Sequence, residues 1–420
     1  AASSLLGFAV SSALIGCVLG GMVGGIVASA LGRKRGLMIA AVLFIISAVG
    51  SAYPELGFPH GAPHTFLTQF IIYRIIGGVG VGLASMLSPM YIAEMAPASR
   101  RGGLVAWNQF AIIFGMLVVY FVNYFIALNG DEAWLTSTGW RLMFLSEVIP
   151  AALLFLLVLG VPESPRWLIM KGREAKAVAI LERINGAPEA EVEAQSIRRS
   201  LHGTVKAKLF SYGVGVIVIG MLLSVFQQFI GINVVLYYAP EIFRNMGMGT
   251  NAALAQTIIV GVINLSFTVL AIFTVDRFGR RPLMIIGSLG MAVSMVTLGM
   301  TFFLEQMGFL SLLAMLCYVA SFAVSWGPIC WVLLAEIFPN KIRSQAMALA
   351  VAAQWVANYL VSWTFPMMDK STYLNGIFHH AFAYWIYALM AVLAALFMWR
   401  FVPETKGRSL EEMEKLFAEK

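Results

Sequence analysis

Charged residues are scarce in this chain. Of its 420 residues, 12% are Asp, Glu, Lys or Arg and 60% are hydrophobic, whereas a soluble domain carries about 25% charged residues. Apolar runs of about 20 residues recur along the whole length, and each can cross the hydrocarbon of a bilayer. A soluble protein of this composition would expose large apolar patches to water. The sequence therefore predicts an all-α membrane protein.

Residues for metal binding and catalysis are also few. The chain has three Cys and five His, and no pair of them has the spacing of a structural metal site or a redox motif. The sequence contains no nucleophile elbow, phosphate-binding loop or catalytic dyad. The glycines of residues 77–82 lie inside an apolar run, where close helix packing explains them better than nucleotide binding. We therefore expect no enzyme activity, no metal and no cofactor.

Eleven segments are long enough to span a membrane. The first carries Gly16, Gly20 and Gly24 at four-residue spacing, which predicts a smooth face for close approach of another helix. The expected spans are residues 3–30, 37–53, 68–93, 103–128, 140–161, 210–238, 252–275, 282–304, 308–338, 345–367 and 378–402.

The basic residues predict an orientation. Segments on one side of the expected spans hold 24 of the 28 Lys and Arg residues. By the positive-inside rule this side is cytoplasmic, and it includes the C-terminus. The net charge of +7 then follows from topology and gives no reason to expect nucleic acid as a partner.

A polar stretch divides the chain. Helical spacing extends from Arg173 to Ile184, the residues Asn-Gly-Ala-Pro at 185–188 stop it, and it resumes from Glu189 to Leu201. We predict an N-terminal bundle at 1–162, cytoplasmic linker helices at 163–208, a C-terminal six-helix bundle at 209–402 and a cytoplasmic tail at 403–420.

The two halves repeat each other. The matching pairs are residues 31–34 with 278–281, 91–97 with 333–339, 162–164 with 403–405, and Arg101 with Arg343. About 69 residues precede the second Gly-Arg turn from Phe210, whereas 31 precede the first, so we expect a parent protein with one more helix at its start, giving twelve spans. Parallel halves are typical of alternating-access transporters, whose solute site lies between the halves near mid-membrane.

Amide side chains inside the spans are the best candidates for that site. Amides both donate and accept hydrogen bonds, which suits neutral hydroxyl groups; hydrogen bonding between helices is the alternative role. Asn233 and Tyr237 share a helical face at i and i+4. The candidates are Gln109, Gln227, Gln228, Asn233, Tyr237, Asn264 and Gln354.

Two tryptophans and one proline extend the candidate set. Trp331 and Trp355 lie inside helices, where an indole could stack on the face of a sugar ring or could simply pack. Gly327 and Pro328 should break the tenth parental helix, because proline removes a backbone hydrogen bond. That break could be a gate hinge or a static kink.

Charged residues near the spans form a third group. Arg74 is costly at membrane depth; its partner could lie on the missing helix, or its side chain could extend to the outer interface. A cluster at cytoplasmic helix ends could form salt bridges that change between states or could be plain surface pairs. The cluster consists of Glu94, Arg101, Arg141, Glu147, Asp276, Arg277, Arg280, Glu336 and Arg343.

The chain resembles the sugar-porter family of the major facilitator superfamily over essentially its whole length. The motifs that carry the resemblance are Asp-Arg-Phe-Gly-Arg-Arg at 276–281, Pro-Glu-Ser-Pro-Arg at 162–166, Gln-Gln at 227–228 followed by Asn233, and Pro-Glu-Thr-Lys-Gly at 403–407. The resemblance implies that the amides and tryptophans above bind a sugar and that Tyr237 closes the site from outside. It also implies that Arg74 pairs with an Asp on the absent helix, which couples transport to protons.

Two positions depart from the family pattern. Met116 stands where the pattern for xylose has a Gln near the sugar, which leaves the choice of pentose or hexose open. Ser29 and Ala30 replace the charged pair of the first cytoplasmic turn, so we expect a weaker latch there than at Asp276 and Arg277.

The resemblance implies a proton-coupled monosaccharide transporter of a bacterial inner membrane. We expect D-xylose first and glucose-like hexoses second, protons and the lipid bilayer as further partners, and a monomer. A facilitative hexose uniporter and a transporter-like sugar sensor are the alternatives. Without the first helix, we expect little coupled transport from this chain alone.

Overall fold

The chain is helical throughout its apolar segments. The computed structural model describes residues 2–56, 63–96, 101–202, 213–338 and 342–406. Within these ranges, eleven helical segments are long and apolar enough to cross a membrane. The prediction of an all-α membrane protein with eleven spans is therefore confirmed.

The chain folds as two compact units. Unit 1 comprises Ala1–Ser11, Ile112–Glu132 and Lys206–Lys420, and unit 2 comprises Ser12–Ala111 and Ala133–Val205. The structure thus groups the second part of the fourth span with the C-terminal half. The predicted domain boundaries remain a prediction.

Unit 2 is built around α2 (Arg33–Ala52), which packs against α3 (Pro63–Met95), α6 (Trp140–Leu145) and α7 (Val148–Gly160). A cluster of buried apolar side chains holds these helices together: Ala28, Leu37, Ala40, Leu83, Leu87 and Val158. Burial of each Leu or Val side chain contributes about 1.5–3 kcal/mol in water, whereas packing shape matters more between helices in lipid.

Glycines form the contact between α1 (Ala2–Ala30) and α3. A Cβ placed on Gly20 would lie 3.0 Å from the Cα of Gly82, and a Cβ on Gly78 would lie 2.9 Å from the Cα of Gly16. No larger residue fits at this distance without moving a backbone. The smooth glycine face predicted for the first span is therefore confirmed.

Gly20→Leu should lower the apparent thermal unfolding temperature of the purified protein by several degrees, because overpacking costs about 1–3 kcal/mol or more. Gly21→Leu is the matched control, since a Cβ on Gly21 has nothing within 4 Å. Equal unfolding temperatures for the two variants would contradict the close contact.

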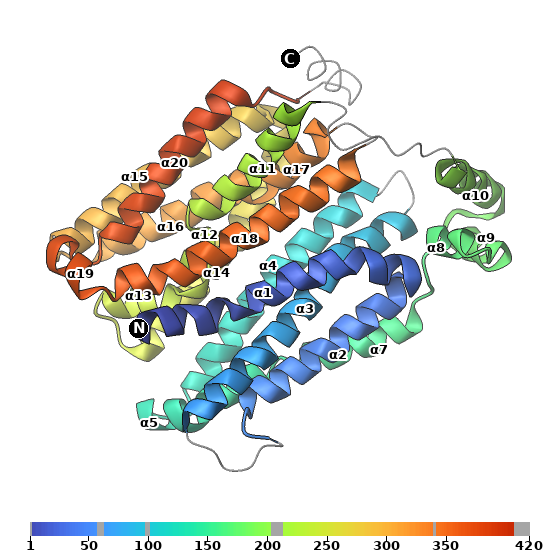
Figure 1. The fold of residues 1–420 in the computed structure, drawn as a ribbon. Coiled ribbons are helices and arrows are strands. Elements are labelled where there is room, and N and C mark those ends of the chain that lie inside the picture. The colour runs from blue at the N-terminus through green and yellow to red at the C-terminus, as the bar shows by residue number, and fades with distance from the viewer. Residues whose placement is uncertain (1, 57–62, 97–100, 203–212, 339–341, 407–420) are drawn as a thin grey trace. The chain divides into compact units, whose positions relative to one another are not determined.

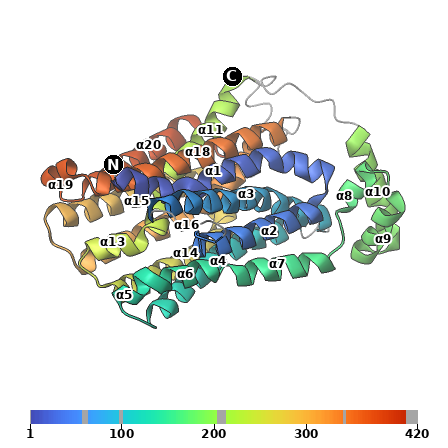
Figure 2. The same ribbon diagram turned by 60° about the horizontal axis from the view of Figure 1, so that its bottom comes forward.

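Three short helices form a separate group at one end of unit 2, beyond α7 (Figure 2). They are α8 (Pro165–Met170), α9 (Glu174–Asn185) and α10 (Ala187–His202). Their shared core contains Trp167, Leu181 and Ala194. The predicted helix–stop–helix pattern is confirmed, although α10 begins at Ala187, within the expected stop.

Unit 1 contains the six spans of the C-terminal half, together with the second part of α4 (Arg101–Ala127) (Figure 1). α15 packs along both α16 and α20, and α11 packs against α17, α18 and α20. Its core includes fully buried aromatic side chains such as Trp326, Tyr318 and Tyr384. The helices are α11 (Val214–Phe229), α12 (Ile232–Tyr237), α13 (Ala239–Asn245), α14 (Thr250–Phe278), α15 (Arg280–Phe303), α16 (Phe309–Val324), α17 (Trp326–Ile337), α18 (Arg343–Asp369), α19 (Thr372–Phe378) and α20 (Phe382–Phe401).

The break predicted near Gly327 and Pro328 is present. α16 ends at Val324, Ser325 leaves the helical region at φ −130° and ψ −91°, and α17 begins at Trp326. Pro328 thus lies in the first turn of α17, where the missing N–H of proline costs little. Whether this bend moves during function remains a prediction.

Candidate functional site

The site begins at a break in the helix formed by α11 and α12. Gly231 has a left-handed backbone, with φ +89° and ψ +15°, which glycine adopts readily because it has no Cβ. A Cβ at this position would also lie 2.7 Å from the Tyr387 ring. The Tyr318 hydroxyl donates to the Ile230 carbonyl at 2.5 Å, which satisfies a carbonyl that the break frees.

The break brings together amides from three helices. Gln354 of α18 donates through Nε2 to Oε1 of Gln227, and Asn233 of α12 donates through Nδ2 to Oε1 of Gln228. Nε2 of Gln228 lies 3.4 Å from Oε1 of Gln227. The structure thus brings these four residues together within unit 1, while their role in binding remains a prediction.

Gln227 differs from the other three amides. Its Nε2 donates to the carbonyls of Trp326 at 2.8 Å and Gly327 at 3.3 Å, and its Oε1 accepts from both Gln228 and Gln354. An amide has two N–H groups and two acceptor lone pairs, so Gln227 is fully used in fixing α17 and α18 to α11. In the described structure, Gln228, Asn233 and Gln354 keep further donors or acceptors for a hydroxylated ligand.

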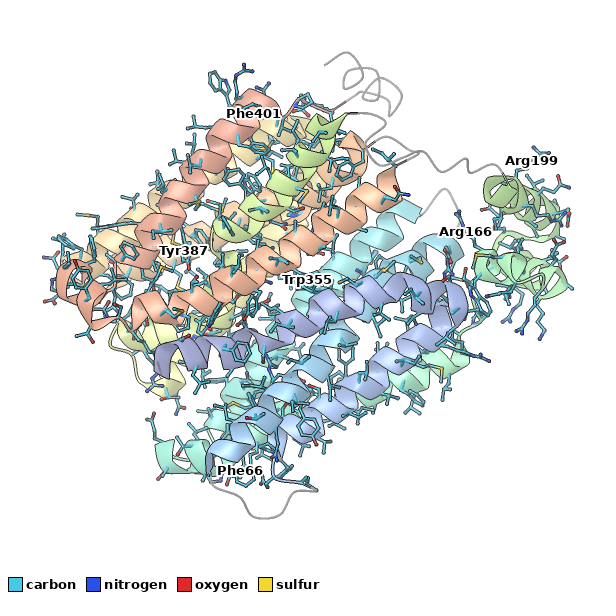
Figure 3. All side chains as sticks on the ribbon, in the orientation of Figure 1. Phe66, Arg166, Arg199, Trp355, Tyr387 and Phe401 are labelled. Atoms are coloured by element: carbon cyan, nitrogen blue, oxygen red, sulfur yellow. The ribbon has the colours of Figure 1, made fainter. Side chains whose placement is uncertain are left out.

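The remaining predicted residues divide between the two units. Asn264 on α14 is buried and Tyr237 is 44% exposed, and Trp331 and Trp355 are half-buried (Figure 3 labels Trp355 on α18). All four belong to unit 1, whereas Gln109, which is half-buried, belongs to unit 2. Their roles in sugar binding also remain predictions.

Two residues that sequence reasoning missed hold the tyrosines next to the amides. Asn358 Nδ2 lies 3.4 Å from the Tyr237 hydroxyl, and Ser362 Oγ donates to Asn358 Oδ1 at 3.0 Å. The Tyr238 hydroxyl donates to the Ser362 carbonyl at 3.0 Å. The signal was present in the sequence, since Gln354, Asn358 and Ser362 follow each other at four-residue spacing on one face of α18.

Gln228→Ala should weaken sugar binding about tenfold, because a ligand hydroxyl loses a hydrogen bond, while the unfolding temperature changes little. Gln227→Ala should lower both the sugar affinity and the unfolding temperature, since it also leaves two carbonyls of α17 without the donor they have in the parent. Titration calorimetry and thermal unfolding measure the two effects, with Gln345→Ala, an exposed amide of α18, as the control. Unchanged sugar affinity in both variants would contradict a sugar site at these amides.

A cluster of ions closes one end of unit 2. Arg33 Nη2 pairs with Glu94 Oε1 at 2.7 Å, and the Ser164 hydroxyl donates to the other oxygen of Glu94. Glu163 accepts from the backbone N–H groups of Arg33 at 3.0 Å and Lys34 at 3.2 Å. A carboxylate at these free N–H groups caps the start of α2 and offsets the helix dipole.

Unit 1 contains the same arrangement. Arg280 Nη2 pairs with Glu336 Oε1 at 2.9 Å, and the Thr405 hydroxyl donates to Glu336 Oε2 at 2.5 Å. Glu404 accepts from the backbone N–H groups of Arg280 at 3.1 Å and Arg281 at 3.0 Å. The internal repeat of the sequence therefore corresponds to a repeat of contacts, in which Arg33, Ser164 and Thr405 take part although they were not predicted gating residues. We call these two clusters the Arg33 latch and the Arg280 latch; their movement during transport remains a prediction.

Glu336→Gln should lower the free energy of unfolding by about 1–3 kcal/mol, because it removes a carboxylate charge that pairs with the mostly buried guanidinium of Arg280. Glu191→Gln is the matched control, since Glu191 pairs with Arg198 at 3.4 Å on the exposed surface of the short helices, where such a pair contributes little. Thermal unfolding distinguishes the two, and equal losses would contradict a special role for the latch.

Arg74 has neighbours within unit 2 that the sequence did not indicate. Its guanidinium lies 5.7 Å from the centre of the Phe144 ring, within the range of a cation–π contact. Its charge also acts on Glu147. The turn between α6 and α7 thus brings Glu147 within electrostatic range of Arg74 on α3. A partner for Arg74 on the missing helix remains a prediction.

The placement of Arg141 and Glu147 among the cytoplasmic ions was wrong. Arg141 Nη1 donates to the Ala52 carbonyl at 2.9 Å and pairs with Glu55 at 2.6 Å. Ala52 is the last residue of α2, whereas Arg33, which pairs with Glu94, is its first. About 28 Å of helix therefore separates the Arg141–Glu55 pair from the Arg33–Glu94 pair. Glu147 precedes α7 by one residue, well inside the fifth span.

Of the four other predicted gating residues, the structure describes the side chain of Arg277 alone. Arg277 is exposed, with its guanidinium 5.8 Å from the Phe278 ring, and its carbonyl accepts from Lys406 at 2.7 Å. The side chains of Arg101, Asp276 and Arg343 lie outside the described part of the structure. The relative strength of the two latches therefore remains a prediction.

An ion cluster repeated in both units and an amide cluster at a broken helix of unit 1 are typical of a secondary membrane transporter. Residues 1–417 match the family described as sugar (and other) transporter. The chain belongs to this family.

The chain is similar to characterised sugar transporters over nearly all of its length. It is 62% identical to the D-xylose-proton symporter of Escherichia coli (strain K12), with 99% of this chain and 87% of the relative covered. It is 42% identical to the glucose facilitated diffusion protein of Zymomonas mobilis, covering 99% and 88%. The inward open structure of the E. coli xylose transporter XylE matches with a TM-score of 0.88 at 60% identity, covering 99% and 90%.

Proposed function

We propose that this protein transports a monosaccharide, D-xylose first, together with protons, by exposing one sugar site to each side of a bacterial inner membrane in turn. The observation that carries the proposal is the amide cluster of Gln227, Gln228, Asn233 and Gln354 at the broken helix of unit 1. Neutral amides suit a neutral polyol, because each can both donate to and accept from a hydroxyl. The 62% identity to the D-xylose-proton symporter supports this choice of substrate.

The proposed orientation follows from the basic residues. The ends of the units that carry Arg33 and Arg280 face the cytoplasm, since most Lys and Arg residues lie on that side. The ends that carry Arg141 and His380 then face outward. The two latches hold the cytoplasmic ends of the helices, and their rearrangement accompanies opening toward the cell interior.

Proton coupling involves Arg74 and Glu147. A carboxylate inside a membrane span is costly and is typical of proton pathways. The Arg74 charge acts on Glu147, so a change in the charge of one residue changes the energy of the other.

Facilitated diffusion without protons is the second candidate. The 42% identity to the glucose facilitated diffusion protein favours it. Met116, which packs on the core of unit 1, offers the sugar no hydrogen-bonding amide and is compatible with either a pentose or a hexose.

Transport assays on the full-length protein in proteoliposomes distinguish proton symport from facilitated diffusion. Addition of D-xylose should make a weakly buffered external medium more alkaline, and transport should continue against a sugar gradient when a pH gradient is imposed. D-xylose counterflow without alkalinisation would support the uniporter. Absence of exchange with xylose, glucose, galactose and arabinose would contradict both.

Arg74→Ala should reduce uphill accumulation of D-xylose at least tenfold while retaining most counterflow, because it removes the charge that acts on Glu147. Arg141→Ala is the matched control, since Arg141 pairs with Glu55. Equal loss of accumulation and counterflow in Arg74→Ala would argue against a role in coupling.

A further inference from the structure

A buried carboxylate lies at the end of unit 1 opposite the Arg280 latch. Asp369, the last residue of α18, is 3% exposed. Its Oδ1 lies 3.0 Å from His380 Nδ1, and both carboxylate oxygens lie 3.2 Å from Asn245 Nδ2. The pair therefore connects α13, α18 and the start of α20. Neither the sugar site nor the latches use it.

The chain holds the His380 imidazole in place on both sides. His380 precedes α20 with a left-handed backbone at φ +69°. Asn375 of α19 donates to the Asp369 carbonyl at 2.6 Å and lies 3.4 Å from His380 Nε2. The Phe302 ring of α15 lies 6.3 Å from the imidazole. Protonation at Nε2 ends the weak contact with Asn375 and converts the Asp369 hydrogen bond into an ion pair.

Other charges at this end have partners of their own. Glu305, after α15, pairs with His379 at 2.9 Å. Lys370, after α18, pairs with Glu241 of α13 at 3.2 Å.

Arg244 of α13 lies 3.9 Å from Glu241 and 3.7 Å from Glu132. On α20, the side chains of Tyr384 and Tyr387 are buried and lie within electrostatic range of Asp369. Among the described side chains, His380 is thus the ion-pair partner of Asp369.

His380 can change its charge in the physiological range. Its hydrogen bond to Asp369 raises the pKa of His380 above the ordinary value of about 6.5, and partial burial opposes this only in part. Because the pKa is raised in the folded state, the stabilisation is fully present below about pH 6.5. It is lost as the pH rises through the folded-state pKa.

Asp369 contacts the helix that follows a segment of the proposed sugar site. The chain from α11 to α13 is broken at Gly231 and again at Tyr238, so α12 and α13 can change direction as short segments. α12 carries Asn233 and Tyr237, and the last residue of α13, Asn245, contacts Asp369 of α18. α18 in turn carries Gln354.

We propose that His380 and Asp369 form a pH-sensitive latch which, when His380 is protonated, holds the end of α13 against α18 and so slows movement of the α12–α13 segment. The effect on sugar exchange rests on the proposed function, whereas the latch itself does not.

The latch is tested on the purified full-length protein without sugar. The unfolding temperature should be about 2–4 °C higher near pH 5.5 than near pH 8.5 because of this pair, and His380→Asn should remove that part of the pH dependence. His379→Asn is the matched control, because its partner Glu305 is exposed. After correction for intrinsic rates, hydrogen exchange of residues 239–245 should increase with pH in the parent but not in His380→Asn.

The same pH dependence in His380→Asn and in the parent, for both readouts, would overturn the proposal. A second arm measures D-xylose counterflow in proteoliposomes at both pH values, where the parent should exchange several-fold faster at the higher pH and His380→Asn should exchange fast at both. A pH-independent exchange ratio between the two proteins would refute the link to the sugar site. Absence of sugar exchange in every protein would instead refute the proposed function. The latch would then be judged by the unfolding temperature and hydrogen exchange measured without sugar.

Discussion

The structure depends on the cost of placing a polar side chain inside a membrane-spanning helix. An unpaired amide or charge at this depth costs several kcal/mol, so each one requires a partner or a ligand. Gln227 meets this requirement completely, because it joins α11 to the carbonyls of Trp326 and Gly327 and to two other amides. Gln228, Asn233 and Gln354 meet it only in part. Their remaining hydrogen-bonding capacity supports the proposal that this cluster binds a polyol.

The two halves contain the same arrangement of a helix cap and an ion pair. In each, a carboxylate after the last span caps the helix that begins at an Arg, and that Arg pairs with a Glu from a neighbouring span. A hydroxyl residue completes each cluster: Ser164 in one half and Thr405 in the other. A cap and an ion pair acting on the same residue fix both the start of the helix and its side chain. Such a cluster therefore has few alternative arrangements, as a two-state latch requires.

Much of this could be predicted from the sequence, because membrane spans need long apolar runs and repeats leave matching motifs. The spans and the glycine contact follow from local patterns, whereas the meeting of the amides depends on the break at Gly231 and on the packing of α18 against α11. The contacts of Arg74 and Arg141 could not be predicted, since they depend on how the turn between α6 and α7 is placed. The latch partner Arg33 was recoverable from the repeat, because Arg280 occupies the same place in the second half. Asn358 and Ser362 were recoverable from their spacing with Gln354.

The most direct test of the central claim is an experimental structure of the full-length protein with bound D-xylose. The account predicts that sugar hydroxyls lie within hydrogen-bonding distance of Gln228, Asn233 and Gln354, while Gln227 keeps its bonds to the start of α17. A sugar bound away from the break at Gly231, with the four amides still paired only to one another, would contradict it.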